Sequence, residues 1–135
     1  MSPNFEPLKY WKESAQDTLD TSDRLFDSQK FHHSLFFLHL TLEKILKALY
    51  IYTKNESPPP IHDLVRLAEK CFDKIDESTK LELAEISTFN VSARYDDYKL
   101  QFYKKATKEY AQKWRGIGKR IFNQYLSQIK WQTPQ

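Results

Sequence analysis

Apolar residues recur at intervals of three and four along most of the chain, a spacing that places them on one face of an α-helix. The second such segment is apolar around most of its circumference, which is typical of a helix buried at the centre of a bundle. We therefore predict an all-α fold, an up-and-down bundle of four long helices and one short one, in a single domain over residues 1–135. The predicted helices are Pro7–Asp27, Phe31–Thr53, His62–Phe72, Ser78–Phe89 and Tyr103–Ile129.

The last predicted helix has the most regular apolar stripe. Its members follow one another at steps of 3, 4, 4, 3, 4 and 4 residues, the spacing of a bundle seam. Gly116 and Gly118 interrupt this helix, where each costs about 1 kcal/mol relative to alanine. They either admit a neighbouring helix closely or bend this one. The stripe consists of Tyr103, Ala106, Tyr110, Trp114, Ile117, Ile121 and Tyr125.

Two segments are predicted to be irregular. Lys54–Pro60 ends in three prolines, which cannot continue a helix. Asn90–Phe102 lacks a clear apolar stripe and separates the last two predicted helices. Asp76 or Ser78 is suited to cap the fourth helix.

Composition narrows the class of protein. The chain has 40% hydrophobic residues and only 2 glycines, which disfavours a β-rich or glycine-loop architecture. Cys71 is the only cysteine, so no intrachain disulfide or cysteine-based zinc site is possible, and we expect a buried thiol in a reducing cytoplasm.

No signal peptide is visible, and the most apolar stretch, Leu35–Tyr52, contains three charges, so we expect a cytoplasmic protein without a membrane span. No catalytic nucleophile, metal cluster or cofactor motif stands out, so we expect none.

The net charge of +3 hides an asymmetry. Residues 99–130 contain nine basic side chains and one acid, a charge of +8, whereas the rest of the chain carries −5. Two interpretations stay open. The basic helix binds a phosphate-rich ligand or an acidic partner, or it pairs with acids of its own bundle.

Three segments contain residues suited to binding. Glu43 and Lys47 are one turn apart on the central helix, where they form an internal ion pair unless Lys44 or Lys47 contacts a phosphate. His62 and Asp63 stand at a predicted helix start, where an aspartate caps amides. His62 either serves as a ligand or base or packs at the loop corner without a chemical role.

The third segment, Ala93–Tyr98, is the most site-like. Arg94 is suited to grip a phosphate through two hydrogen bonds, and Tyr95 or Tyr98 is suited to stack on a base. Alternatively, Arg94 pairs with Asp96 or another acid and holds the loop.

The order of these segments resembles the HEPN family of small helical bundles. The likeness is carried by Glu-Lys-x-Leu-Lys-Ala at residues 43–48, His-Asp-Leu at 62–64 and Ala-Arg-Tyr at 93–95. The resemblance implies a helical bundle that commonly forms a homodimer. It also implies one of two kinds of function, because the family contains RNA-cutting toxins and non-cleaving modules that bind nucleotides or partner proteins.

The cleaving members have an arginine followed after four to six residues by a histidine. Carried over to Arg94, that histidine would stand at 99–101, where the chain has lysine, leucine and glutamine, and no histidine follows His62. The family's segment usually reads Ala-Arg-Tyr-Pro-Asp, and here Asp96 replaces the proline, which weakens the transfer of nucleotide binding. The resemblance therefore favours the non-cleaving branch, whose members look like partners of small nucleotidyltransferases.

From this we predict a non-catalytic module that binds a nucleotide or an RNA phosphate, possible partners being a second copy and a small nucleotidyltransferase. The alternatives are a protein-interaction module without a nucleotide ligand and a divergent ribonuclease toxin that uses His62 with Arg94. We assign structural roles to Glu43, Asp63 and Asp96. The expected binding residues are Arg94, Tyr95, Tyr98, Lys44, Lys47 and His62.

Overall fold

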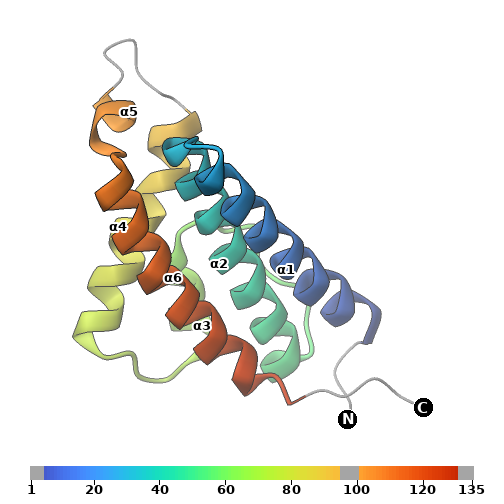
Figure 1. The fold of residues 1–135 in the computed structure, drawn as a ribbon. Coiled ribbons are helices and arrows are strands. Elements are labelled where there is room, and N and C mark those ends of the chain that lie inside the picture. The colour runs from blue at the N-terminus through green and yellow to red at the C-terminus, as the bar shows by residue number, and fades with distance from the viewer. Residues whose placement is uncertain (1–4, 95–100, 131–135) are drawn as a thin grey trace.

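A computed structural model describes residues 5–94 and 101–130 of the chain, and all regular structure within them is helical (Figure 1). Four helices are long and two are short, so the predicted all-α bundle is confirmed, with one short helix more than expected. The helices are α1 (Phe5–Asp27), α2 (Phe31–Lys54), α3 (Leu64–Cys71), α4 (Glu77–Arg94), α5 (Gln101–Lys105) and α6 (Lys108–Gln128).

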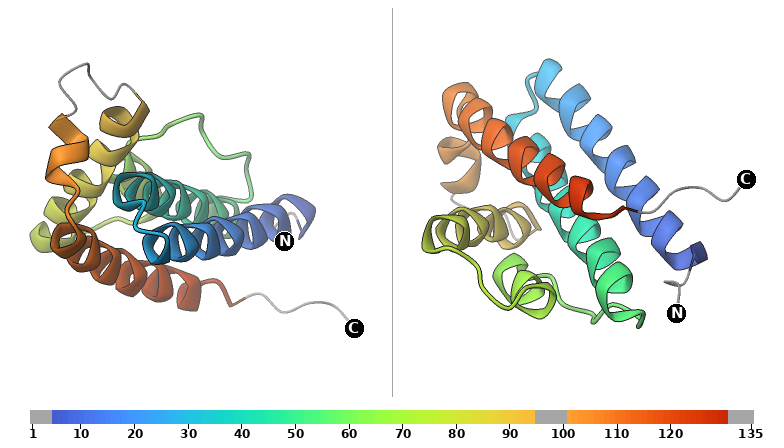
Figure 2. Two further views of the ribbon diagram at one scale, coloured as in Figure 1. Left: turned by 45° about the horizontal axis from the view of Figure 1, so that its top comes forward. Right: turned by 90° about the horizontal axis from the view of Figure 1, so that it is seen from below.

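Helix α2 is the centre of the bundle, as predicted. It packs against each of the other five helices, and Figure 2 shows it between α1 and the α3–α4 pair. It supplies more of the buried apolar side chains than any other helix, and these side chains provide most of the hydrophobic stabilisation. The fully buried ones on α2 are Leu35, Leu38, Leu42, Ile45, Leu46, Ala48, Leu49 and Ile51.

A pair of buried serines joins α1 to α2 near the turn between them. Ser22 Oγ donates to the Ser34 carbonyl at 2.7 Å, and Ser34 Oγ donates to the Ser22 carbonyl at the same distance. Because each hydroxyl satisfies a backbone carbonyl of the other helix, both polar groups are buried without a desolvation penalty. The turn itself uses Gln29 at φ 63°, a left-handed conformation.

Helix α6 approaches α2 at Gly118. A Cβ atom at Gly118 would lie 2.6 Å from Leu38 Cδ1, whereas one at Gly116 would meet nothing within 4 Å. The close-approach interpretation therefore holds for Gly118. Gly116 lies on the exposed side of the same helix.

Two predicted helix boundaries were wrong. The last predicted helix is interrupted at residues 106–107, because the Thr107 side chain accepts a hydrogen bond from the Tyr110 amide and caps a new helix. Helix α4 continues past Phe89 through residues that we predicted to be irregular, because no glycine or proline interrupts it there. It ends at Arg94. On α4, Leu83, Ile86 and Phe89 are fully buried, whereas Leu81 and Ala84 are exposed.

The end of the bundle at the top of Figure 1 brings together several chain segments. Here α1 is joined to α2, α4 ends, and α5 and α6 begin. We call it the upper end. None of the described helices is long and apolar enough to cross a membrane.

Candidate functional site

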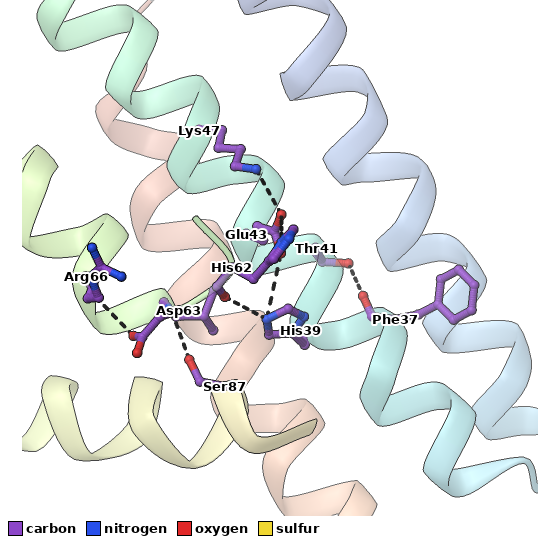
Figure 3. Close-up of polar contacts among 10 residues, drawn as sticks. Phe37, His39, Thr41, Glu43, Lys47, His62, Asp63, Arg66 and Ser87 are labelled. Carbon is purple, nitrogen blue, oxygen red and sulfur yellow. Dashed lines mark hydrogen bonds and ion pairs between the residues drawn. The ribbon is translucent and has the colours of Figure 1, made fainter. Parts of the chain in front are cut away.

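The buried carboxylate of Glu43 is the centre of a polar cluster between α2 and the loop before α3 (Figure 3). Its Oε2 atom accepts from Lys47 Nζ at 3.0 Å and from His62 Nδ1 at 3.0 Å. Lys47 reaches Glu43 because four residues on a helix return the chain to the same face. His62 comes from the loop, so only the folded chain brings it to this carboxylate.

Lys47 is almost as buried as its partner. Each of the two side chains is 8% exposed, and Lys47 Nζ also lies 5.2 Å from the centre of the Trp11 ring on α1. The ammonium group thus has an anion and an aromatic face as neighbours, which offsets much of the cost of burying it. The internal ion pair that the sequence left open is present, and phosphate contact by Lys47 stays a prediction.

His39 is part of the cluster, although sequence reasoning assigned it no role there. Its Nε2 atom lies 3.0 Å from the His62 carbonyl oxygen and 3.8 Å from Glu43 Oε1. A carbonyl oxygen can only accept, so this contact places a proton on Nε2 of His39. The spacing of His39 and Glu43 by four residues was the available signal, but the loop contact depends on the tertiary fold.

Two further hydrogen bonds fix the chain immediately after His62. The Asp63 carboxylate caps α3 by accepting from the Arg66 amide at 3.1 Å, and Ser87 Oγ accepts from the Leu64 amide at 2.8 Å (Figure 3). The segment is therefore fixed to α2 through His62 and to α4 through Leu64. The side chain of His62 remains 56% exposed.

Lys44 lies apart from this cluster. Its Nζ donates to Ser14 Oγ on α1 at 2.8 Å, and burial lowers the pKa of Lys44, opposed by the nearby charges of Asp17 and Glu43. The structure thus brings together Glu43, Lys47 and His62 and directs Lys44 toward α1.

The Ala-Arg-Tyr segment lies mostly outside the described residues. Arg94 is the last residue of α4, and α5 begins at Gln101. The side chain of Arg94, and all of Tyr95, Asp96 and Tyr98, fall outside what the structure describes. What the fold does fix is that both flanks of the segment are at the upper end (Figure 1).

Part of the predicted basic helix is neutralised by acids of the bundle. Arg115 and Lys119 both pair with Asp23 on α1, Arg120 pairs with Glu82 at 2.7 Å and Lys105 with Glu85 at 3.0 Å. The self-pairing interpretation therefore holds for these four cations. Four exposed lysines of this segment have no ion pair with an acid among the described residues, and Lys104 and Lys108 are the two at the upper end. The set is Lys104, Lys108, Lys113 and Lys130.

The described residues include no group of three or more histidine, cysteine, aspartate or glutamate side chains arranged to hold a metal ion. The described residues form a small helical bundle with a buried polar cluster around Glu43 and exposed lysines at the upper end. Comparison with protein families identifies the family directly, because the HEPN domain model matches residues 8–128. The chain belongs to the HEPN domain family. Comparisons with curated proteins and with solved structures give no match.

Proposed function

We propose that this HEPN domain is a non-catalytic module that binds the phosphate of a nucleotide or a nucleic acid at the upper end of the bundle. The observation that supports it is the placement of positive charge. Lys104 and Lys108 are exposed there without acidic partners among the described residues, beside the point where α4 ends at Arg94. Unpaired cations on one face attract phosphate groups and give binding that weakens with salt.

Direct contact is assigned to Arg94, with Tyr95 and Tyr98 stacking on a base. Lys44 and Lys47 already donate to Ser14 and Glu43, so their contact with phosphate would require that these bonds be exchanged. We propose that the Glu43 cluster acts mainly by positioning, since it fixes the loop before α3 on the central helix.

The test is a thermal-shift screen with nucleoside mono-, di- and triphosphates and a short RNA at low and moderate salt. A ligand that binds the folded chain raises its melting temperature. We expect a shift that is lost in Arg94→Ala and kept in Arg66→Ala, which removes the same charge from an exposed position on α3. Equal shifts in the two variants would place the ligand elsewhere.

A second candidate is a divergent ribonuclease. The pair of His62 Nδ1 and the buried Glu43 carboxylate favours it, because a carboxylate that orients an imidazole is a recurring general-base arrangement. The test is RNA decay on expression of the chain. Decay that stops in His62→Ala, with the variant still folded, would replace our first proposal by this one.

The partners remain proposals that the family resemblance supports. They are a second copy of this chain and a small nucleotidyltransferase. If no nucleotide or RNA binds, and a partner protein copurifies at a fixed ratio without nucleotide, the interaction-only alternative holds.

A further inference from the structure

A pocket of about 340 Å³ opens at the upper end, between the start of α2 and α5. This volume is at the lower limit for small-molecule sites, which occupy about 300–1,000 Å³. It is sized for one compact ligand and not for an extended polymer. Its lining comes from residues 29–33 and from Tyr103 and Ala106.

The ionisable side chains that line the pocket are Lys30, His32, His33 and Tyr103, and none of them is a carboxylate. Lys30 is exposed at the start of α2, His33 is exposed one turn of chain further, and no acidic residue occurs in the first turn of α2. Lys104 adjoins the lining residue Tyr103 in sequence. A pocket lined by one lysine, two imidazole rings and no carboxylate favours an anionic ligand over a cationic one.

The other walls are rings. The His32 and His33 rings have centroids 3.9 Å apart, and the Tyr103 ring meets His32 edge-on at 5.0 Å. These contacts connect α2 to α5 and fix the position of the Tyr103 ring at the pocket. Tyr103 nevertheless remains 56% exposed. An exposed, positioned phenol ring offers a face on which a nucleobase can stack.

We propose that this pocket binds a mononucleotide, with the phosphate at Lys30 and His33 and the base against Tyr103. The inference rests on the proposed function and adds to it a site that neither the sequence motifs nor the family match assigns. None of the residues that carry it belongs to the Ala-Arg-Tyr segment or to the Glu43 cluster.

The experiment is isothermal titration calorimetry of the full chain at 150 mM salt with AMP, adenosine and inorganic phosphate in turn. The pocket variants are Lys30→Glu and Tyr103→Ala. The matched controls are Lys130→Glu, the same charge reversal beyond the far end of α6, and Tyr10→Ala, which removes an exposed ring from the far end of α1. Circular dichroism of each variant confirms that it is folded.

We expect AMP to bind more tightly than adenosine or phosphate alone. Each pocket variant should weaken AMP binding about tenfold or more, since a charge-assisted hydrogen bond or a stacked ring contributes about that factor. The controls should change it less than about twofold, because charges farther away than about 8 Å are screened at this salt.

Four outcomes would overturn the inference, and the first two separate it from the proposed function. If the wild type binds AMP and the pocket variants match their controls, the pocket is wrong and the proposed function stands. If a short RNA binds in the thermal-shift screen but AMP does not bind in calorimetry, the pocket assignment fails and the proposed function stands. If neither binds, both proposals fail. Phosphate binding as tight as AMP binding, unaffected by Tyr103→Ala, would show a simple anion site and overturn the mononucleotide assignment.

Discussion

Among the described residues, a charged side chain is buried only where an oppositely charged side chain lies beside it. Glu43 is 6% exposed on the central helix, and its carboxylate is the shared acceptor for Lys47 and His62. An ion pair of this kind adds little net stability compared with apolar side chains, but loss of one member leaves a buried charge without compensation. Removal of the Glu43 charge is therefore expected to destabilise the fold mainly because the buried ammonium group of Lys47 would lose its anionic partner.

Glu43→Gln should lower the free energy of unfolding by about 3–5 kcal/mol, because it strands the buried ammonium of Lys47. Urea unfolding measures this. Glu82→Gln is the matched control, since Glu82 pairs with Arg120, whose side chain is 55% exposed, and should cost no more than about 1 kcal/mol. Equal losses in the two variants would mean that the Glu43 cluster is not a buried charge network.

The thiol of Cys71 gives a pH-dependent test at the same scale. Burial raises the pKa of Cys71 from its ordinary 9.0 to about 12, with the charge of Lys54 opposing the shift, and Sγ lies 3.5 Å from the Leu46 carbonyl oxygen. Because the thiolate is the reactive form, alkylation of the folded chain should keep accelerating up to about pH 12. In urea the rate should level off near pH 9. Folding stability tied to this thiol is complete below pH 9 and is lost as the pH rises toward 12. A folded-state rate that levels off near pH 9 would contradict the raised pKa.

At the scale of elements, the contact between α2 and α6 depends on the absence of a side chain. Gly118 leaves room for Leu38, which is fully buried, whereas Gly116 faces open space two residues away. The same helix therefore contains one glycine with a packing role and one without.

Gly118→Ala should destabilise the fold by about 1–3 kcal/mol, because its Cβ overpacks against Leu38. Gly116→Ala should instead stabilise it by up to about 1 kcal/mol through helix propensity. Chemical unfolding of both variants gives the comparison. Two changes of the same sign would show that α6 does not approach α2 as described.

The existence of the long helices could be predicted from the sequence because each buries a face with helical periodicity. The residues at which the helices begin and end could be predicted less well. The break before α6 is set by Thr107, a residue type that commonly caps helices, but the apolar stripe runs through it from Tyr103 to Tyr110 and conceals the break. The extension of α4 to Arg94 has no positive signal beyond the absence of glycine and proline.

For the candidate site, local spacing was enough for the Glu43–Lys47 pair and for the Asp63 cap, since both lie within one helical turn. The contact of His62 with Glu43 spans 19 residues, and that of His39 with the His62 carbonyl spans 23. Such contacts depend on how the loop packs on α2, which periodicity does not specify. The pocket at the upper end likewise forms from segments about 70 residues apart.

At the scale of the whole molecule, charge is distributed unevenly between the two ends and between paired and unpaired cations. Asp23, Glu82 and Glu85 pair with four cations of the basic stretch, and Lys104 and Lys108 at the upper end have no ion pair with a described acid.

The family resemblance predicts a homodimer. Light scattering coupled to size exclusion should give about twice the chain mass of 16.2 kDa at micromolar concentration. A mass that stays at 16.2 kDa at 100-fold higher concentration would rule out a dimer of useful affinity.

The central claim is that a phosphate-bearing ligand binds at the upper end, and an amide-resolved NMR titration of the wild-type chain with AMP tests it most directly. We expect the shifted amides to cluster in residues 29–33 and 94–108, with those around Glu43 and Lys130 nearly unchanged. Shifts centred on Glu43 and His62, or no shifts with either millimolar AMP or a short RNA, would contradict it.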